Sequence, residues 1–185
     1  DTSRITNANS MFYQAQSFNC GLLRFYQDDK RDNDQTPRQN INTKVVTVLG
    51  KTYIAWDISK MTNMFEMFMN CHAFNNDISN WNTSNVTVAD AMFQAGSFNC
   101  GNPYGKAPSE TQSGSLPSRN IDTKIVTLNI GTQSITYRAW DVSKISSMRN
   151  MFYGCNGMRQ DMTNWDTSNL KYTAYMFKYG RTFNS

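Results

Sequence analysis

The feature that most constrains this chain is a tryptophan motif that recurs four times at a fixed distance from a Met-Phe pair. Asp or Asn follows each Trp directly, Ser stands three residues after it, and the Met-Phe pair begins eleven residues after it. A fifth pair, Met11-Phe12, has no Trp before it in the chain. The tryptophans are Trp56, Trp81, Trp140 and Trp165, and the pairs that follow them begin at Met67, Met92, Met151 and Met176.

The basic repeat is 25 residues long, as the spacings from Trp56 to Trp81 and from Trp140 to Trp165 show. A unit of this size cannot bury its own apolar face, whereas copies stacked side by side can. The sequence therefore predicts one repeat domain, residues 1–185, of about five coils. Its constant Trp and Phe positions predict an interior column of aromatic side chains. The core residues expected from this phase are Trp56, Trp81, Trp140, Trp165, Phe68, Phe93, Phe152 and Phe177.

Two insertions interrupt the repeat. Each begins with a variable polar loop, 21–40 or 101–120, and continues into a near-copy of one sequence. The runs 44–56 and 124–140 are rich in β-branched residues and carry a central Gly, Gly50 or Gly131, which predicts two β-hairpins.

The expected fold class is a repeat solenoid of mixed, β-rich α+β type, with short strands, short helices or 3₁₀ turns and the two inserted β-hairpins. Residues 74–81 are interpreted as a short strand, and residues 86–93 have roughly helical apolar spacing. Asn is abundant whereas Glu and Leu are scarce, a composition that disfavours a helical bundle.

Charge and hydropathy exclude two partner classes. The net charge of +4 is spread along the chain rather than clustered, which argues against nucleic-acid binding. No apolar run is long enough to cross a bilayer, so no membrane insertion is expected. The first residues are not a signal peptide, and neither end carries a capping repeat. We therefore expect that the chain is part of a longer protein, or that a neighbouring molecule covers its ends.

Residues 74–99, FNNDISNWNTSNVTVADAMFQAGSFN, resemble the repeat of BspA-like leucine-rich-repeat surface proteins, most closely its mycoplasma type. Residues 161–184 show the same pattern, and 56–76 and 140–160 match it in their second halves. The resemblance implies a solenoid on a secreted or cell-surface protein that serves in adhesion or partner binding. It carries no catalytic residues with it.

The polar residue after each Trp has two interpretations. Asp57, Asn82, Asp141 and Asp166 form a column that either caps turns through the following Ser or ligates calcium. The single Asn and the constant Ser favour turns. Two glycosylation sequons, at Asn82 and Asn85, lie inside the same motif and are also interpreted as turn residues.

The four cysteines predict disulfides if the chain is extracellular. Cys20 and Cys100 are equivalent in the repeat, as are Cys71 and Cys155, so the expected pairs are Cys20–Cys71 and Cys100–Cys155. The alternative is that Cys71 and Cys155 are small buried thiols. The spacing does not fit a zinc site, and His72 is the only histidine. Since His72 has no recurring counterpart beside Cys155, we expect no catalytic Cys-His pair, no enzyme activity and no metal or other cofactor.

The insert loops carry the chemistry that does not repeat. Aromatic and cationic side chains there have the composition of interface hot spots. The sequence thus predicts an extracellular or cell-surface recognition or adhesion module that binds a protein or glycan of another cell through the insert loops and the solenoid face. The competing hypothesis is a structural subunit that self-associates by end-to-end or lateral packing into a filament, sheath or fibre. The expected partner-binding residues are Arg24, Phe25, Tyr26, Arg31, Tyr104 and Lys106.

Overall fold

The computed structural model describes residues 2–18, 41–100, 102 and 120–182. Within them the regular secondary structure is two antiparallel sheets of two strands each, with no helix. The described part of the chain is all-β, and the mixed, helix-containing solenoid expected from the repeat is wrong. The strands are β1 (Lys44–Val48), β2 (Lys51–Ala55), β3 (Lys124–Ile130) and β4 (Gln133–Ala139).

Both hairpins lie where the β-branched runs predict them, and each closes through a two-residue turn. Val48 pairs with Lys51 around Leu49 and Gly50, whose φ angles of 49° and 76° define a type I′ turn. In the second hairpin Gly131 has a φ of 59° and Thr132 lies outside the left-handed region, as in a type II′ turn. These turns match the right-handed twist of the strands.

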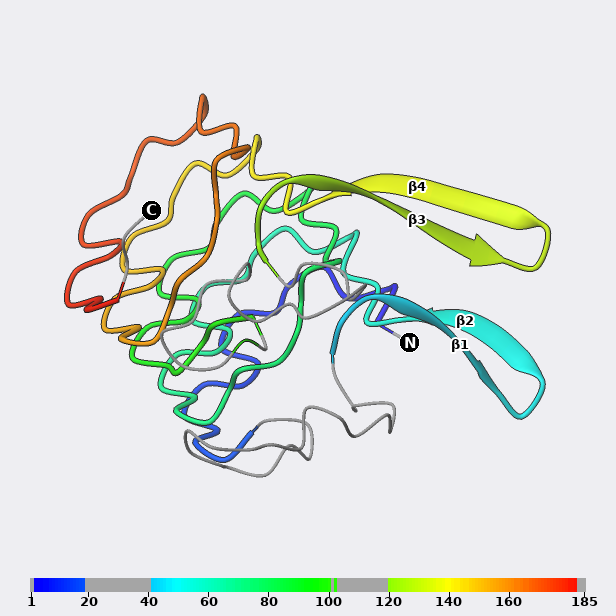
Figure 1. The fold of residues 1–185 in the computed structure, drawn as a ribbon, viewed down its shortest axis with the longest axis horizontal. Helices are drawn as coiled ribbons and strands as arrows, with labels where there is room; N and C mark the ends of the chain where they lie inside the picture. The colour runs from blue at the N-terminus through cyan, green and yellow to red at the C-terminus, as the bar shows by residue number, and fades with distance from the viewer. Residues whose placement is uncertain (1, 19–40, 101, 103–119, 183–185) are drawn as a thin grey trace.

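Five turn segments carry the rest of the fold. We define them as residues 7–15, 63–71, 88–96, 147–155 and 172–180, the first to the fifth. They lie side by side in chain order, joined by a row of single parallel bridges (Figure 1). The bridges run from Asn7 to Asn63, Val88, Ser147 and Tyr172. The two insertions leave the row between the first and second segments and between the third and fourth.

Backbone hydrogen bonds within the turn segments alternate between two directions. In the second segment Met67 N–H donates to the Met64 carbonyl within the segment, whereas Phe68 N–H donates to Met92 of the next segment. Glu66 and Asn70 adopt left-handed conformations with φ of 55° and 60°. A helix needs every N–H bonded four residues back along its own chain. Here half of the donors are committed to the neighbour, so the predicted helix at 86–93 forms turns instead.

The core is a continuous column of stacked phenylalanines. Phe68 lies 5.2 Å from Phe12 and 5.8 Å from Phe93 between ring centroids, and Phe93 lies 5.5 Å from Phe152. Trp81 and Trp140 are fully buried beside this column, whereas Trp56 and Trp165 are half-buried. The aromatic rings and the methionines that fill the gaps between them hold the row of segments together.

Candidate functional site

The two hairpins, which we call the hairpin pair, form the most prominent feature of the surface. They project to the same side of the row of turn segments and run next to each other (Figure 1). Strand β1 contacts β3, although the two sheets share no ladder hydrogen bonds. The hairpin pair is thus a surface contributed by two repeats and offered in one direction.

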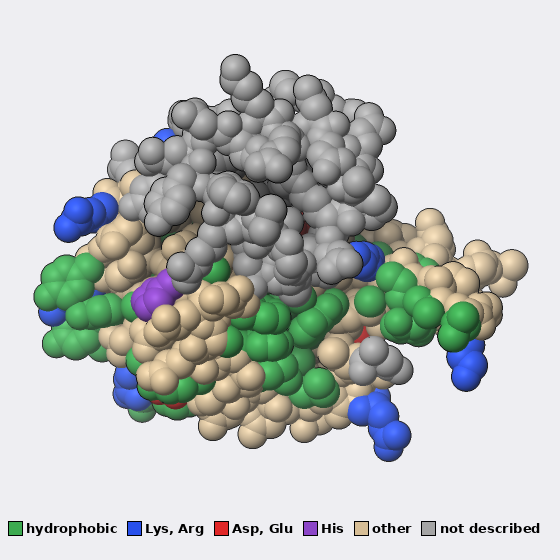
Figure 2. Space-filling model, turned by 90° about the horizontal axis from the view of Figure 1, so that it is seen from below, with side chains coloured by type: hydrophobic (Ala, Val, Ile, Leu, Met, Phe, Trp, Pro, Cys, Tyr) green, Lys and Arg blue, Asp and Glu red, His purple; other side chains and the backbone are tan. Residues whose placement is uncertain are grey.

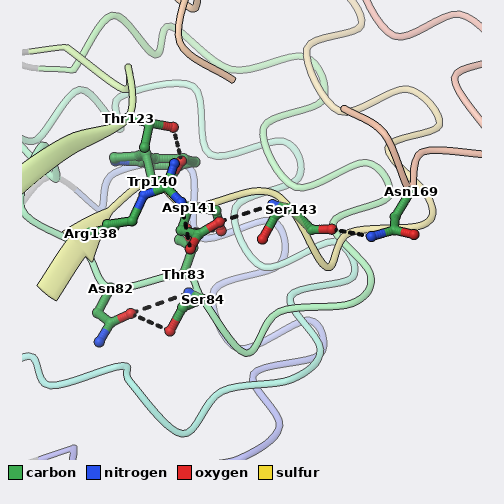
Figure 3. A network of polar contacts seen from close by, with 9 residues as sticks. All are labelled: Asn82, Thr83, Ser84, Thr123, Arg138, Trp140, Asp141, Ser143 and Asn169. Carbon is green, nitrogen blue, oxygen red and sulfur yellow. Dashed lines mark hydrogen bonds and ion pairs between the residues drawn. The ribbon is translucent and has the colours of Figure 1, made fainter. Parts of the chain in front are cut away.

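Each hairpin is fixed at its base by the repeat motif. In the second hairpin Thr123 Oγ1 donates to the Trp140 carbonyl at 2.7 Å, and Thr83 Oγ1 donates to the Asp141 carbonyl at 2.9 Å (Figure 3). The first hairpin repeats the arrangement, with Thr43 Oγ1 bonded to the Trp56 carbonyl at 2.9 Å. Thr43 and Thr123 directly precede the first strands of the two hairpins, so these bonds tie the two ends of each hairpin together where it leaves the core.

Tyr137 adds a second anchor for β4. Its hydroxyl donates to the Asn80 carbonyl at 2.5 Å, and burial raises the pKa of Tyr137 to about 12. The phenol therefore stays a neutral donor throughout the physiological range. At the start of β3, burial lowers the pKa of Lys124 from its usual value. These contacts give the buried ends of both strands a structural role, whereas the tips of the hairpins are exposed.

Apolar side chains are exposed along the projecting part of the hairpin pair. Leu49, at the tip of the first hairpin, is 98% exposed, and Ile125 on β3 is 67% exposed. Val48 and Ile135 are also exposed. Figure 2 shows hydrophobic and basic side chains together at the projecting end of the molecule. Apolar and basic side chains therefore lie together on the exposed part of the hairpin pair.

Sequence reasoning did not single out this surface, since it placed binding in the insert loops and on the polar face of the repeats. The expected partner-binding residues Arg24, Phe25, Tyr26, Arg31, Tyr104 and Lys106 lie outside the described residues, so their role stays a prediction. A local signal for the hairpin pair was nevertheless present. Leu49-Gly50 occupies a turn in which Asn-Gly is the preferred sequence, so an apolar residue stands where a polar one is favoured.

The polar column after the tryptophans forms turns, as its Ser spacing predicts. The Asp57 carboxylate accepts a hydrogen bond from Ser59 N–H at 3.0 Å, and the Asp141 carboxylate accepts one from Ser143 N–H at 3.1 Å. At Asp166, hydrogen bonds from the Ser168 side chain and from Ser168 N–H lower the pKa of the carboxyl group. Within the described ranges no group of three or more acidic, His or Cys side chains is placed to hold a metal ion. The structure therefore favours the turn interpretation over a calcium column.

The predicted bond between Cys100 and Cys155 is wrong, because the two residues do not form a disulfide. The Cys155 thiol instead donates to the Phe93 carbonyl at 2.9 Å, and the Cys71 thiol donates to the equivalent Phe12 carbonyl at 2.7 Å. Cys71 is likewise a thiol, and its expected partner, Cys20, lies outside the described residues. The repeat equivalence of Cys71 and Cys155 is real, but it reflects an internal thiol position rather than a bridge.

Burial makes these two thiols poor nucleophiles. It raises the pKa of Cys71 to about 11 and that of Cys155 to about 12, so almost no thiolate is present at neutral pH. We expect both residues to remain unmodified when the native protein is treated with iodoacetamide at pH 8, and to react fully in denaturant. Peptide mass mapping after each treatment measures this. Rapid labelling of Cys155 in the native protein would contradict the buried position described here.

The fold and the surface together define an all-β tandem-repeat protein whose repeats form a row and carry a projecting hairpin pair. Residues 1–45, 45–103 and 124–185 match a family described as Mycoplasma protein of unknown function, DUF285, and the chain belongs to that family. The mycoplasma-type repeat recognised in the sequence is thereby confirmed. No match was found among curated proteins or solved structures. The described residues contain no helix long and apolar enough to cross a bilayer.

Proposed function

We propose that this protein is an extracellular or cell-surface recognition module that binds a protein on another cell through the hairpin pair. Its repeat is similar to those of BspA-like surface proteins, which supports a surface location. The insert loops 21–40 and 101–120 directly precede the two hairpins in the sequence, so non-repeated residues lead into this surface from both insertions. Loops and tips on a rigid scaffold are a common location for binding residues.

The proposal is carried by the backbone conformation and the exposure of Leu49. Its backbone is left-handed, with a φ of 49°, which costs a residue other than Gly or Asn about 1 kcal/mol. Its side chain is 98% exposed and so gains nothing from the core. A residue that costs stability at a turn and makes no internal contact is best explained by a contact outside the chain.

The test replaces Leu49 with Asn, which suits the left-handed turn. We expect Leu49→Asn to be as stable as the wild type or more stable, and to bind about tenfold less tightly, as for loss of one interface anchor. Beads coated with each protein and added to cultured epithelial cells, counted by flow cytometry, measure binding. Thr132→Asn at the tip of the second hairpin is the matched control, because Thr132 is exposed and polar.

Two further measurements make the test decisive. Protease treatment of the cells should abolish binding, whereas enzymatic removal of surface glycans should not. The opposite result, or specific binding on a glycan array that Leu49→Asn does not alter, contradicts the proposal of a protein partner. Absence of wild-type binding to the cells contradicts an adhesive role, and a folded Leu49→Asn variant with unchanged binding excludes the hairpin tip.

A further inference from the structure

The hairpin pair carries positive charges and no negative ones. Residues 44–55 and 124–139 include four basic side chains and no Asp or Glu, although the whole chain has 14 acidic residues against 18 basic ones. The four are Lys44, Lys51, Lys124 and Arg138. A surface with charges of one sign attracts a partner of the opposite sign and repels a partner of the same sign.

Two of these cations are exposed, and each stands opposite an exposed aliphatic side chain. In the first hairpin Lys51 pairs with Val48, which is 50% exposed. In the second hairpin Arg138 pairs with Ile125, and more than half of each side chain is exposed. Residues directly opposite each other in an antiparallel ladder share one face, with their Cβ atoms about 5 Å apart. Each hairpin thus presents one apolar group and one cation side by side, and we call these the two apolar–cation pairs.

Both cations keep hydrogen-bonding capacity for a partner. Arg138 Nη1 lies 4.0 Å from Asp141 Oδ2, which is too long for a hydrogen bond, and a guanidinium carries five N–H donors. Within the described ranges this is the one ion pair, so the Lys51 ammonium has no carboxylate there. The hydroxyl groups of Thr127 and Thr136, on the same face as Arg138, bond each other at 3.1 Å. The cations are therefore the polar groups of this surface that are best able to bind a ligand.

The two apolar–cation pairs set two requirements for an occupant. A two-fold contact with a second copy of the chain would set the cations of one hairpin pair against those of the other, which is unfavourable. The occupant therefore needs negative charge. The exposed Val48 and Ile125 are removed from water only by apolar groups placed against them. An occupant that meets both requirements carries carboxylates next to apolar side chains.

We propose that the hairpin pair binds an acidic segment of a partner protein, in which carboxylates stand next to apolar side chains. This inference rests on the recognition function proposed above and adds the chemistry of the partner. At each apolar–cation pair one partner carboxylate meets Lys51 or Arg138, and an adjacent apolar side chain covers Val48 or Ile125. The Arg138 guanidinium holds its carboxylate through two parallel N–H···O bonds, whereas the Lys51 ammonium acts as a point charge near Leu49.

The experiment measures the binding of protein-coated beads to cultured epithelial cells, with charge variants of the hairpin pair. Lys51→Glu should bind about tenfold less tightly, because it sets a carboxylate against the carboxylates of the partner. Lys51→Arg keeps the charge and should bind as the wild type does. Lys60→Glu is the matched control, because Lys60 is an exposed lysine outside the two hairpins and the change in net charge is the same.

Treatment of the cells identifies the source of the negative charge. Conversion of carboxylates to amides with a water-soluble carbodiimide and glycinamide should abolish binding, whereas sialidase and heparinase should leave it unchanged. Vesicles of phosphatidylcholine and phosphatidylserine should not bind the beads. Raising the salt concentration from about 0.1 M to about 1 M shortens the Debye length from about 10 Å to about 3 Å, so it should weaken wild-type binding more than that of Lys51→Glu.

Equal binding by Lys51→Glu and Lys60→Glu, with both folded by circular dichroism, overturns the acidic partner. The recognition proposal then still stands, provided that Leu49→Asn loses binding. Loss of binding after sialidase or heparinase, or binding of the beads to the anionic vesicles, also overturns the inference, because the negative charge then belongs to a glycan or a lipid. Absence of wild-type binding to the cells overturns both proposals.

Discussion

Replacing Trp81 with alanine is expected to lower the free energy of unfolding by about 3–5 kcal/mol, the range for large-to-small changes of buried aromatic residues. Trp81 is completely buried, and its indole N–H donates to the Ile41 carbonyl at 2.7 Å. Its own carbonyl accepts from Trp140 N–H at the base of the second hairpin. Truncation thus leaves a cavity and removes the indole donor from the buried Ile41 carbonyl. Since small domains are stable by only about 5–15 kcal/mol, the variant should be largely unfolded in mild urea.

Urea unfolding followed by tryptophan fluorescence and circular dichroism measures the loss. Trp165→Ala is the matched comparison, because Trp165 makes the equivalent bond to the Ile121 carbonyl at 2.6 Å but is only half-buried. We expect a distinctly smaller loss there. Equal losses at the two sites, or a near-wild-type midpoint for Trp81→Ala, would show that burial in the aromatic column does not determine stability.

Asn99→Leu is expected to produce the second large loss, for a different reason. Asn99 is fully buried, and its side-chain oxygen accepts from Arg159 N–H at 2.8 Å and from Gln160 Nε2 at 2.9 Å. Leucine has a similar volume but no acceptor. Gln160 Nε2 keeps the carbonyls of Asn99 and Arg159 as acceptors, at 3.1 and 3.2 Å, whereas Arg159 N–H loses its bond to the side chain. Loss of the acceptor of a buried donor costs about 1–3 kcal/mol, which is the loss expected here.

Asn129→Leu controls for the change in residue type, because Asn129 lies exposed on β3 and accepts only from Ser134 Oγ at 2.7 Å. Its free energy of unfolding should change by less than about 0.5 kcal/mol, as is usual for surface substitutions. Chemical denaturation compares the two variants. If Asn99→Leu matches Asn129→Leu, the buried amide network is not a source of stability.

Most of the large buried side chains of this protein could be predicted from the spacing of the repeat. A large apolar residue that returns at one phase of a repeat has to face the common interior, and Trp81, Phe68 and Phe93 do lie there. The hairpins were predictable for a local reason, since β-branched runs around Gly50 and Gly131 leave few other conformations. Both inferences depend on side chains whose preference acts locally or repeats regularly.

The helical prediction failed because apolar spacing does not reveal where a backbone donor is bonded. Residues 86–93 have a helix-like pattern, yet Ala91 is left-handed with a φ of 54° and its N–H donates to Arg149 in the next segment. Alanine is the strongest helix former, so local propensity does not predict a left-handed backbone at this residue. The neighbouring segment supplies the bonds that stabilise this conformation, and Arg149 lies 58 residues from Ala91 in the sequence.

The long-range polar contacts and the surroundings of the thiols could not be predicted from the sequence, for a similar reason. Asn99 and Gln160 meet across 61 residues, and no motif marks either as buried. The expected Cys100–Cys155 bond followed from an even cysteine count and from repeat equivalence. The structure instead places Cys155 against the Phe93 carbonyl, a contact that requires only a small buried side chain. At the surface, the loop residues chosen by composition lie outside the described residues, whereas Leu49 was visible only through its turn geometry.

The alternating direction of the backbone bonds also bears on how such a protein changes length over generations. Each of the first four turn segments donates the same alternate N–H groups to the same alternate carbonyls of the next, so the backbone bonds do not distinguish one neighbour from another. A genetic duplication or deletion of one 25-residue unit therefore lengthens or shortens the row by one step and leaves the remaining contacts as they were. Recombination between copies of the unit is therefore a source of folded variants. The length of the row of turn segments then becomes a property that differs between lineages and is inherited.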